Sequence, residues 1–457
     1  MAFLQLRSTN PNFSFLLKKN PASSMIAKEL RKGVLFGYYS DAGQTFNAYF
    51  RDAFNEISYP EYKDQEFEYV NSTRYSSAQF VLNAVSELFR DAFKKRNEEQ
   101  DPDDVYETTL IINMLKLDNR RTLAAFTKHF AESCDIQADE VTPKYYRITL
   151  TTKKSLYYLL NLTNLFAAFA VIRNKTEYLP LDDVTVEKYF SALSVIDAPY
   201  FIRYHFKIEL LRGDRKFEKY RNLLNTSSRY PIEMVQGDTV QMRMDAVEKE
   251  VNFSNHLVDV GCGEGRYAWA FTRKMLKDKT YYAIDTNEEC RATVTRKASF
   301  KELTNIQVFD SLDAFMRLIN LLKQDSRRTE ALAVEKFDFI LGEVIEHMSL
   351  DEATELVTKC LTFEQCNSVI ITTPNADFNS YYFDEDKEMR HPDHHFEFTM
   401  VQFNDWVNSI KLNCHSVVIT PIPFKRISLE VKMLDIGDKV NGTPVTLGAV
   451  LSPVRCV

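Results

Sequence analysis

The stretch that decides the fold of this 457-residue chain is Val258-Asp259-Val260-Gly261-Cys262-Gly263-Glu264-Gly265. It begins as an apolar strand and ends in three alternate glycines that open an amphipathic helix, in a chain with only 12 glycines in all. Glycine allows positive φ angles and lets the backbone pass close to a ligand. The stretch therefore predicts a ligand-binding loop between a strand and a helix.

Around this loop, short apolar segments alternate with amphipathic ones from Leu257 onward. The pattern predicts strands at 257–260, 280–285, 305–309, 337–342 and 367–372, and helices at about 265–277, 287–299, 311–323 and 351–362. Such alternation is typical of a mostly parallel sheet that helices cover on both faces. Two later runs, 415–421 and 444–451, are expected to form a closing antiparallel pair. The fold class is thus predicted to be α/β.

Polar residues follow the predicted strands at the sheet edge where ligands bind. Asp285 ends the second strand, twenty residues after Gly265, where its carboxylate can accept both ribose hydroxyls of an adenosyl group. Asp310 and Ser311 follow the third strand, where they could contact the same ligand, cap the next helix, or do both.

The spelling Asp-x-Gly-x-Gly-x-Gly resembles the S-adenosylmethionine loop of class I methyltransferases rather than the Gly-x-Gly-x-x-Gly loop of dinucleotide enzymes. This resemblance implies a C-terminal Rossmann-like methyltransferase fold with S-adenosylmethionine as cofactor. The implied cofactor contacts are Asp259, Gly261, Gly263, Gly265, Asp285, Asp310 and Ser311.

A cluster of metal-binding residue types follows the fourth strand. Glu343, Glu346 and His347 stand at i, i+3 and i+4, so a helical turn beginning there would point all three the same way. Oxygen and imidazole ligands suit Mn²⁺ or Mg²⁺, and the nitrogen favours Mn²⁺. A second cluster, at 390–399, offers His391, His394 and His395, one of which could complete a site with two carboxylates and two imidazoles.

Such an ion could chelate a vicinal diol and lower the pKa of one of its hydroxyls. A neighbouring histidine, from among His391, His394 and His395, could take the proton. In an RNA chain, only the 3′ end carries free 2′ and 3′ hydroxyls together.

Three motifs together resemble those of the small-RNA 3′-terminal 2′-O-methyltransferases. They are Gly342-Glu343-Val344-Ile345-Glu346-His347-Met348, Thr372 to Asn379, and Arg390 to Thr399. The resemblance implies Glu343, Glu346, His347 and His394 as metal ligands, with His391 or His395 as helpers. The chain has Phe398 and Met400 where that family usually has Trp and Arg, a difference that affects a terminal-base or phosphate contact and leaves the metal site intact.

The N-terminal half is similar to the domain that precedes the methyltransferase in the bacterial RNA-repair branch of that family. Three segments carry this resemblance: Asn10-Pro11-Asn12-Phe13, Phe36-Gly37-Tyr38-Tyr39 and Tyr69-Val70-Asn71. The resemblance implies an α+β domain at 1–235 that binds a polynucleotide kinase/phosphatase/ligase and activates its ligase module. The methyltransferase domain is expected at 236–457. The polar stretch 94–104 is a further candidate boundary, between sub-domains of the first half.

Composition limits the remaining choices. The seven cysteines form no Cys-x-x-Cys pair, so neither a disulfide framework nor a thiolate zinc site is supported. A net charge of −7 argues against indiscriminate nucleic-acid binding, although the basic residues of 203–229 could form a local phosphate-facing strip or a solvated helix face. No membrane span or secretory signal is read, and a cytoplasmic protein is expected.

We therefore expect an RNA 3′-terminal ribose 2′-O-methyltransferase that acts in RNA repair and takes RNA with a free 2′,3′-diol. Two alternatives stay open. A metal-dependent small-molecule O-methyltransferase would use the same donor and ion, but it leaves the 390–399 cluster and the long N-terminal half unexplained. A non-enzymatic ligase-activating adaptor would be expected to have lost the proposed ligands.

Overall fold

The computed structural model describes residues 3–30, 33–51, 76–118, 120–175, 179, 181–324, 335–383, 389–414 and 427–455. The chain divides into two compact units. Unit 1 comprises Met1–Ile232 with Tyr381–Asp386, and unit 2 comprises Glu233–Ser380 with Lys387–Val457.

Unit 1 is built on a seven-stranded antiparallel sheet with the order β2–β3–β4–β1–β5–β7–β6. Side chains alternate across it, so that Leu4 and Leu6 of β1 are buried. The strands are β1 (Phe3–Ser8), β2 (Ile26–Leu30), β3 (Gly33–Ser40), β4 (Thr45–Arg51), β5 (Thr108–Lys116), β6 (Asp135–Thr142) and β7 (Tyr145–Thr152).

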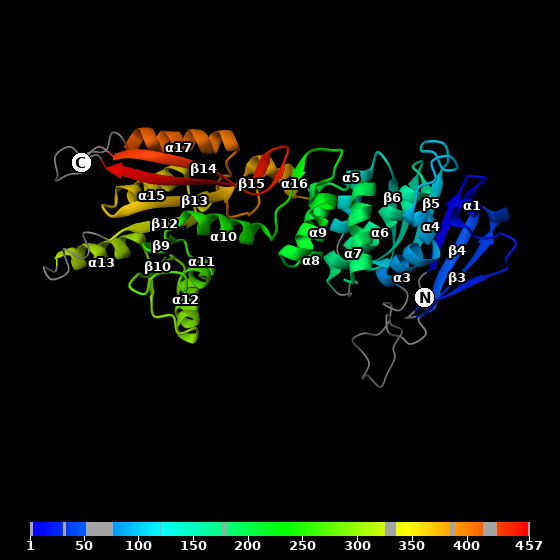
Figure 1. The fold of residues 1–457 in the computed structure, drawn as a ribbon, viewed down its shortest axis with the longest axis horizontal. Helices are drawn as coiled ribbons and strands as arrows, with labels where there is room; N and C mark the ends of the chain where they lie inside the picture. The colour runs from blue at the N-terminus through cyan, green and yellow to red at the C-terminus, as the bar shows by residue number, and fades with distance from the viewer. Residues whose placement is uncertain are drawn as a thin grey trace. The chain divides into compact units, whose positions relative to one another are not determined.

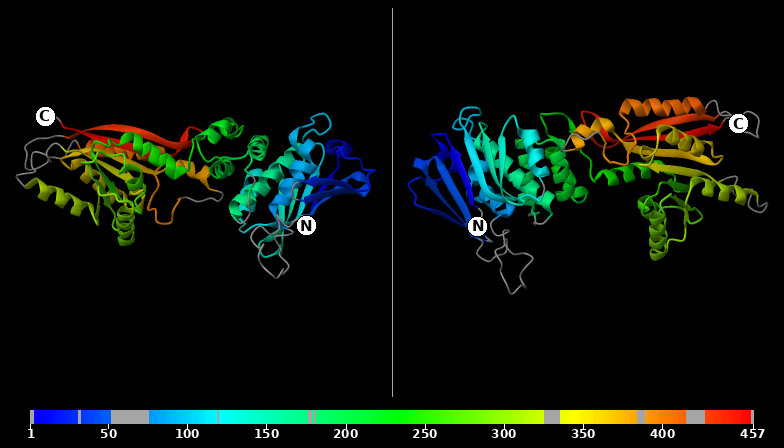
Figure 2. Two further views of the ribbon diagram at one scale, coloured as in Figure 1. Left: turned by 60° about the horizontal axis from the view of Figure 1, so that its bottom comes forward. Right: turned by 180° about the vertical axis from the view of Figure 1, so that it is seen from behind.

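The helices of unit 1 pack around α6 (Leu156–Asn174), whose side chains are buried on nearly every side. By length and composition alone α6 could cross a membrane, but 83% of its apolar window is buried inside the unit. A helix that is apolar all round is expected at such a position in a core. Within unit 1, α6 lies against β5 and β7, and Figure 2 shows the strands and helices of this unit from two further sides. The other helical elements are α1 (Phe13–Leu17), η1 (Asp41–Gly43), α3 (Ala78–Asn83), η2 (Ala84–Leu88), α4 (Arg90–Lys94), α5 (Arg121–Phe130), α7 (Asp183–Val195), α8 (Tyr200–Leu210) and α9 (Asp214–Asn225).

The polar stretch 94–104 lies inside unit 1 and does not separate compact parts of it. The strands before and after this stretch share one sheet, because β1 pairs with β5. Asp101 is buried, and its carboxylate accepts a hydrogen bond of 2.5 Å from the backbone N–H of Leu156 at the start of α6. The stretch therefore connects strands of one sheet, and its buried residue Asp101 caps the core helix while its other residues are exposed or half-buried.

A continuous phosphate-facing strip, one of the two possibilities for the basic residues of 203–229, is interrupted by burial, because Arg203 and Lys207 lie inside unit 1. The guanidinium of Arg203 donates to four carbonyl oxygens at 2.5–3.1 Å, those of Ala198, Leu223, Leu224 and Leu193. These bonds tie α8 to the ends of α7 and α9. Arg203 therefore has a structural role and does not face a phosphate.

Unit 2 contains an eight-stranded sheet with the order β11–β10–β9–β12–β13–β15–β14–β8 (Figure 1). The strands from β11 to β13 are parallel, and β15 runs antiparallel to both β13 and β14. The bounds are β8 (Ile232–Glu233), β9 (His256–Val260), β10 (Tyr281–Ile284), β11 (Ile306–Phe309), β12 (Phe337–Gly342), β13 (Cys366–Pro374), β14 (Ile427–Val440) and β15 (Thr443–Arg455). The Rossmann-like α/β class predicted for this half is confirmed.

Helices cover both faces of this sheet, and each face has its own apolar core. One core joins the sheet to α13 (Leu312–Gln324), α15 (Leu350–Thr362) and α17 (Met400–Cys414). The other joins it to α10 (Thr239–Glu250), α11 (Arg266–Phe271) and α12 (Glu288–Phe300). The short elements η3 (Ile345–His347), η4 (Ala376–Phe378) and α16 (Asn379–Tyr382) follow the carboxyl ends of β12 and β13.

The structure corrects two of the expected elements. The helix expected at 265–277 ends at Phe271, where a turn bond from the N–H of Lys274 to the carbonyl oxygen of Phe271 follows. The closing antiparallel pair is β14 with β15, so the first strand of that pair is 427–440. The expected strand 415–421 lies outside the described residues.

Candidate active site

The glycine loop adopts the conformations for which its composition is suited. Gly261, Gly263 and Gly265 have φ angles of 76°, 52° and 80°. A Cβ on Gly261 would lie 2.6 Å from Val344, whereas a Cβ on Gly263 would meet nothing within 4 Å. The loop is therefore packed against the segment after β12 at one end and open at its middle glycine, where a ligand can approach the backbone.

Asp285 lies beside the loop, at the carboxyl end of β10. One of its carboxylate oxygens accepts a hydrogen bond of 2.7 Å from the N–H of Gly263, and the other accepts one of 2.8 Å from Asn287. Asp259 is placed differently: it is buried within the sheet and accepts a hydrogen bond of 2.5 Å from the hydroxyl of Tyr281. Burial raises the pKa of Asp259 to about 7. Its carboxylate therefore contacts the sheet interior.

Asp310 and Ser311 follow β11 at the same edge of the sheet. The hydroxyl of Ser311 accepts a hydrogen bond of 3.2 Å from the N–H of Ala314 and donates one of 2.9 Å to Asp310. Ser311 thus occupies the N-cap position of α13. This cap is compatible with a ligand contact by the same two residues, which stays a prediction.

The second cluster assembles after β12. Candidate ligand atoms of Glu346, His347 and His394 all lie within 4.8 Å of one another. One oxygen of Glu346 accepts a hydrogen bond of 3.1 Å from Thr373, and the other, Oε1, is buried with no hydrogen-bond partner. A buried acceptor left without a partner costs free energy, and a cation would satisfy it. The donor set of this group therefore fits a divalent ion.

Glu343 does not lie in the helical turn that was expected to carry it. The helical turn is a 3₁₀ turn that begins at Ile345, so Glu343 lies before it with a φ of 59°, in the left-handed region. One carboxylate oxygen pairs with Arg243 of α10 at 3.1 Å, and the other is buried without a partner. Glu343 is thus outside the group of three but close enough to affect it.

The charges in this cluster act on one another. Burial, and then the neighbouring Glu343, raise the pKa of Glu346 well above its usual range. Burial also raises the pKa of Glu343, while Arg243 and Arg390 act in the opposite direction. Burial and His394 lower the pKa of His347, which favours the neutral imidazole that binds metals. The arrangement places the lone pairs of two buried side chains, Glu346 and His394, beside the exposed ring of His347.

The three histidines of the second motif are placed differently. The rings of His347 and His394 are 4.8 Å apart, and the ring of His391 lies 5.7 Å from His394 and 6.1 Å from His347. His395 is exposed, and its backbone N–H donates to the carbonyl oxygen of Glu346 at 2.8 Å. Of the three predicted catalytic histidines, His391 and His394 therefore have their rings near that of His347. His395 contacts the cluster only by the hydrogen bond from its backbone N–H to Glu346.

Sequence reasoning missed several residues around the cluster. Glu397 accepts a hydrogen bond of 2.6 Å from Nδ1 of His394. Arg390 and Asn379 contact each other at 2.8 Å, and both donate to Glu397. Asn379, Arg390 and Glu397 belong to the motifs on which the family resemblance rests, so their position in these motifs could have indicated a role beside the cluster. Arg243 lies about 100 residues before its partner Glu343, and no local pattern indicates it.

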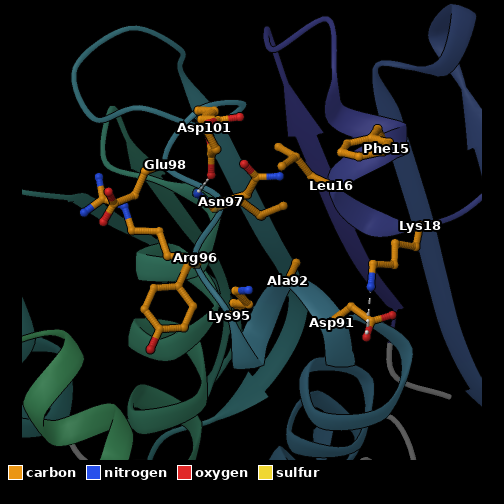
Figure 3. Close-up of a pocket in the computed structure, with 13 residues that line it drawn as sticks. Phe15, Leu16, Lys18, Asp91, Ala92, Lys95, Arg96, Asn97, Glu98 and Asp101 are labelled. Atoms are coloured by element: carbon orange, nitrogen blue, oxygen red, sulfur yellow. Dashed lines mark hydrogen bonds and ion pairs between the residues drawn. The ribbon is translucent and has the colours of Figure 1, made fainter.

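Unit 1 has a separate hollow of about 540 Å³, shown in Figure 3. Lys18 and Asp91 form an ion pair of 3.5 Å at its edge, and Arg96 pairs with Asp103 at 3.0 Å. Charges of both signs line the hollow, which favours no particular class of ligand.

Two family models match the chain. The Hen1 N-terminal domain matches residues 3–229, and a methyltransferase domain matches residues 258–363. The two matches follow each other along the chain and together cover most of it.

Curated small RNA 2′-O-methyltransferases are similar to part of the chain. The protein of Xenopus tropicalis is 35% identical over 103 residues, which are 22% of this chain and 28% of that protein. The protein of Arabidopsis thaliana is 28% identical over 173 residues, which are 34% of this chain and 17% of that protein. The chain thus spans less than a third of the length of either relative.

A solved structure covers more of the chain. A chain in the structure of the Pnkp1/Rnl/Hen1 RNA repair complex has a TM-score of 0.77 and 25% identity, over 98% of this chain and 100% of its own length. The likeness therefore includes both units.

Proposed function

We propose that this chain, which belongs to the Hen1 family, transfers a methyl group from S-adenosylmethionine to the 2′-hydroxyl of the 3′-terminal ribose of RNA. The methyltransferase domain supports the donor, and the relatives that are small RNA 2′-O-methyltransferases support the acceptor. The observation that carries the proposal is the buried, unpartnered Oε1 of Glu346, with His347 and His394 beside it.

The residues of unit 2 have separate roles in this proposal. Glu346, His347 and His394 would hold Mn²⁺ or Mg²⁺, and Glu343 would add a second carboxylate. An ion held there lowers the pKa of a bound hydroxyl and neutralises the negative charge that develops on its oxygen. Asp285, fixed beside the N–H of Gly263, would accept hydrogen bonds from the ribose hydroxyls of the cofactor.

The proton of the attacking hydroxyl needs an acceptor near the ion. The side chain of His391 is 54% exposed, and its ring lies 5.7 Å from that of His394. It can therefore reach a substrate and is our first candidate for the general base. The ring of His395 is exposed and remains the second candidate.

We also propose that unit 1 binds a polynucleotide kinase/phosphatase/ligase protein and activates its ligase module. The support is the match of residues 3–229 to the Hen1 N-terminal domain, together with the Hen1 chain that is assembled with Pnkp1 and Rnl in the solved complex. The two units would then have separable activities.

The test compares three RNAs that differ only in their 3′ end: a 2′,3′-diol, a 2′-deoxy nucleotide and a 3′-phosphate. Methyl transfer from labelled S-adenosylmethionine, with Mn²⁺ or Mg²⁺, is expected on the diol alone. Label on the 2′-deoxy RNA would contradict the proposed position of transfer. Cofactor binding without any labelling would instead favour a small-molecule acceptor.

A further inference from the structure

We propose that Glu397 is a positioning residue that holds His394 in the one tautomer and orientation able to bind a metal ion. The inference rests on the proposed metal-binding function of the cluster. The side chain of Glu397 is 1% exposed and that of His394 is 7% exposed, so water does not compete for their contact. Their 2.6 Å hydrogen bond joins Oε1 of Glu397 to Nδ1 of His394.

The direction of this hydrogen bond determines which ring nitrogen can bind an ion. An ionised carboxylate only accepts hydrogen bonds, so the proton lies on Nδ1 and the lone pair on Nε2. A histidine that binds a metal commonly donates its other N–H to a carboxylate, which fixes the ring and makes the free nitrogen more basic. Glu397 is placed to do this for His394.

Glu397 is itself held by groups from two other segments. Its Oε1 also accepts a hydrogen bond of 2.6 Å from the N–H of Arg390, and its Oε2 accepts one of 2.6 Å from the amide of Asn379. The guanidinium of Arg390 donates to the side-chain oxygen of Asn379 at 2.8 Å and to the carbonyl oxygen of Asn375 at 3.0 Å. Because three donors converge on one carboxylate, its position is fixed.

This network extends to the closing hairpin of the sheet. The guanidinium of Arg390 donates to the carbonyl oxygen of Val445 at 2.7 Å. The side-chain amide of Asn375 donates to the carbonyl oxygen of Pro444 at 2.8 Å. His394 is thus connected through Glu397 and Arg390 to the start of β15. A regular strand, rather than a free loop, fixes the position of the ligand.

The experiment measures Mn²⁺ binding to the full-length chain by electron paramagnetic resonance, without RNA or cofactor. Glu397→Ala is expected to weaken Mn²⁺ binding about 10- to 100-fold. Glu397→Gln keeps an acceptor oxygen and is expected to lose less. Glu355→Gln, which removes an exposed carboxylate of α15, is the matched control and should bind like the wild type.

A second measurement separates orientation from a general loss of structure. Nitrogen-15 NMR of the His394 ring is expected to show the proton on Nδ1 in the wild type and a mixture of tautomers in Glu397→Ala. If Glu397→Ala does not fold, Asn379→Ala, which removes one donor to Glu397, is measured in its place and should show a smaller shift in the same direction.

The outcomes are distinguishable from those of the proposed function. If the wild type binds Mn²⁺ and the folded variants bind it equally well with an unchanged tautomer, the positioning role is wrong and the proposed function stands. If the wild type binds no Mn²⁺, the proposed metal site is wrong and the positioning role fails with it, whereas the methyl-transfer assay tests the proposed function separately.

Discussion

Arg203 in unit 1 and Glu346 in unit 2 are both buried charges, but their surroundings differ. The guanidinium of Arg203 donates to four carbonyl oxygens, whereas Glu346 has one oxygen bonded to Thr373 and another with no partner. Burial is costly for both, and only a full set of partners offsets that cost. The difference teaches that burial alone does not indicate function, and that a buried carboxylate oxygen without a partner does so when two imidazoles lie beside it.

The largest effect is expected from Glu346→Ala. Loss of a metal ligand removes several kcal/mol of transition-state stabilisation, so methyl transfer to the 2′,3′-diol RNA should fall at least about 10³-fold. Glu346→Gln should lose activity equally. Because it removes a buried unpaired charge, it should not destabilise the metal-free protein in urea unfolding.

Glu346→Ala also tests whether the two units have separate activities. Ligase activation by the Glu346→Ala protein should equal that of the wild type, and ligase activation by His394→Ala should equal it too. Equal loss of methylation and ligase activation would contradict the assignment of the two activities to different units.

Arg203→Ala should destabilise unit 1 by about 3–5 kcal/mol, because it removes the Arg203 hydrogen bonds to four carbonyl oxygens and creates a cavity. Arg215→Ala on the exposed face of α9 is the control and should change stability by less than about 0.5 kcal/mol. Urea unfolding monitored by circular dichroism measures both. An Arg203→Ala protein as stable as the control would show that the comparison with Glu346 is mistaken.

Asp259 lies between these two cases, since it is buried with a single hydrogen-bond donor, Tyr281. Its pKa is raised to about 7 in the folded state. Between about pH 4 and 7, the carboxyl is therefore protonated in the folded protein and ionised in the unfolded chain. Its contribution to stability therefore falls as the pH rises through this range, by at most about 4 kcal/mol for three pKa units.

Asp259→Asn removes this dependence. The free energy of unfolding of the variant minus that of the wild type should therefore be larger at pH 8 than at pH 5. Urea unfolding at the two pH values measures this difference. The same difference at both would mean that Asp259 is ionised throughout.

The smallest effect is expected from Ser311→Ala, which removes the N-cap of α13 and should cost about 1 kcal/mol. Ser349→Ala removes the N-cap of α15 and is the matched control, because Ser349 is not a proposed cofactor contact. A loss of S-adenosylmethionine affinity in the first variant alone would support a ligand contact by Ser311. Equal affinity in both would leave Ser311 with its capping role only.

Much of the fold of unit 2 was predictable, because each buried strand is short, apolar and followed by a polar residue or a glycine. The bounds of β12 were predicted correctly from Phe337 to Gly342. β14 was missed, although Leu429, Val431 and Met433 alternate with polar residues there. The early end of α11 was not visible, because nothing in the apolar pattern marks Phe271 as a terminus.

The candidate site was predictable where its residues share a motif, and not where the fold brings distant segments together. Glu346, His347 and His394 come from two motifs and lie side by side. Arg243 comes from α10, and its pairing with Glu343 depends on how that helix packs on the sheet. The left-handed conformation of Glu343 was also hidden, since glycine is the usual residue there. The roles of all these residues stay predictions.

The link from His394 to Val445 also has a consequence for the order of events during synthesis. About 100 residues separate Glu343 from Val445, and a ribosome adds about 5–20 residues each second. For about 5–20 s, the two glutamates exist without the hairpin that anchors Arg390. The ion site thus forms only after the hairpin of unit 2 has been added, and metal is expected to enter the folded sheet rather than to guide its folding.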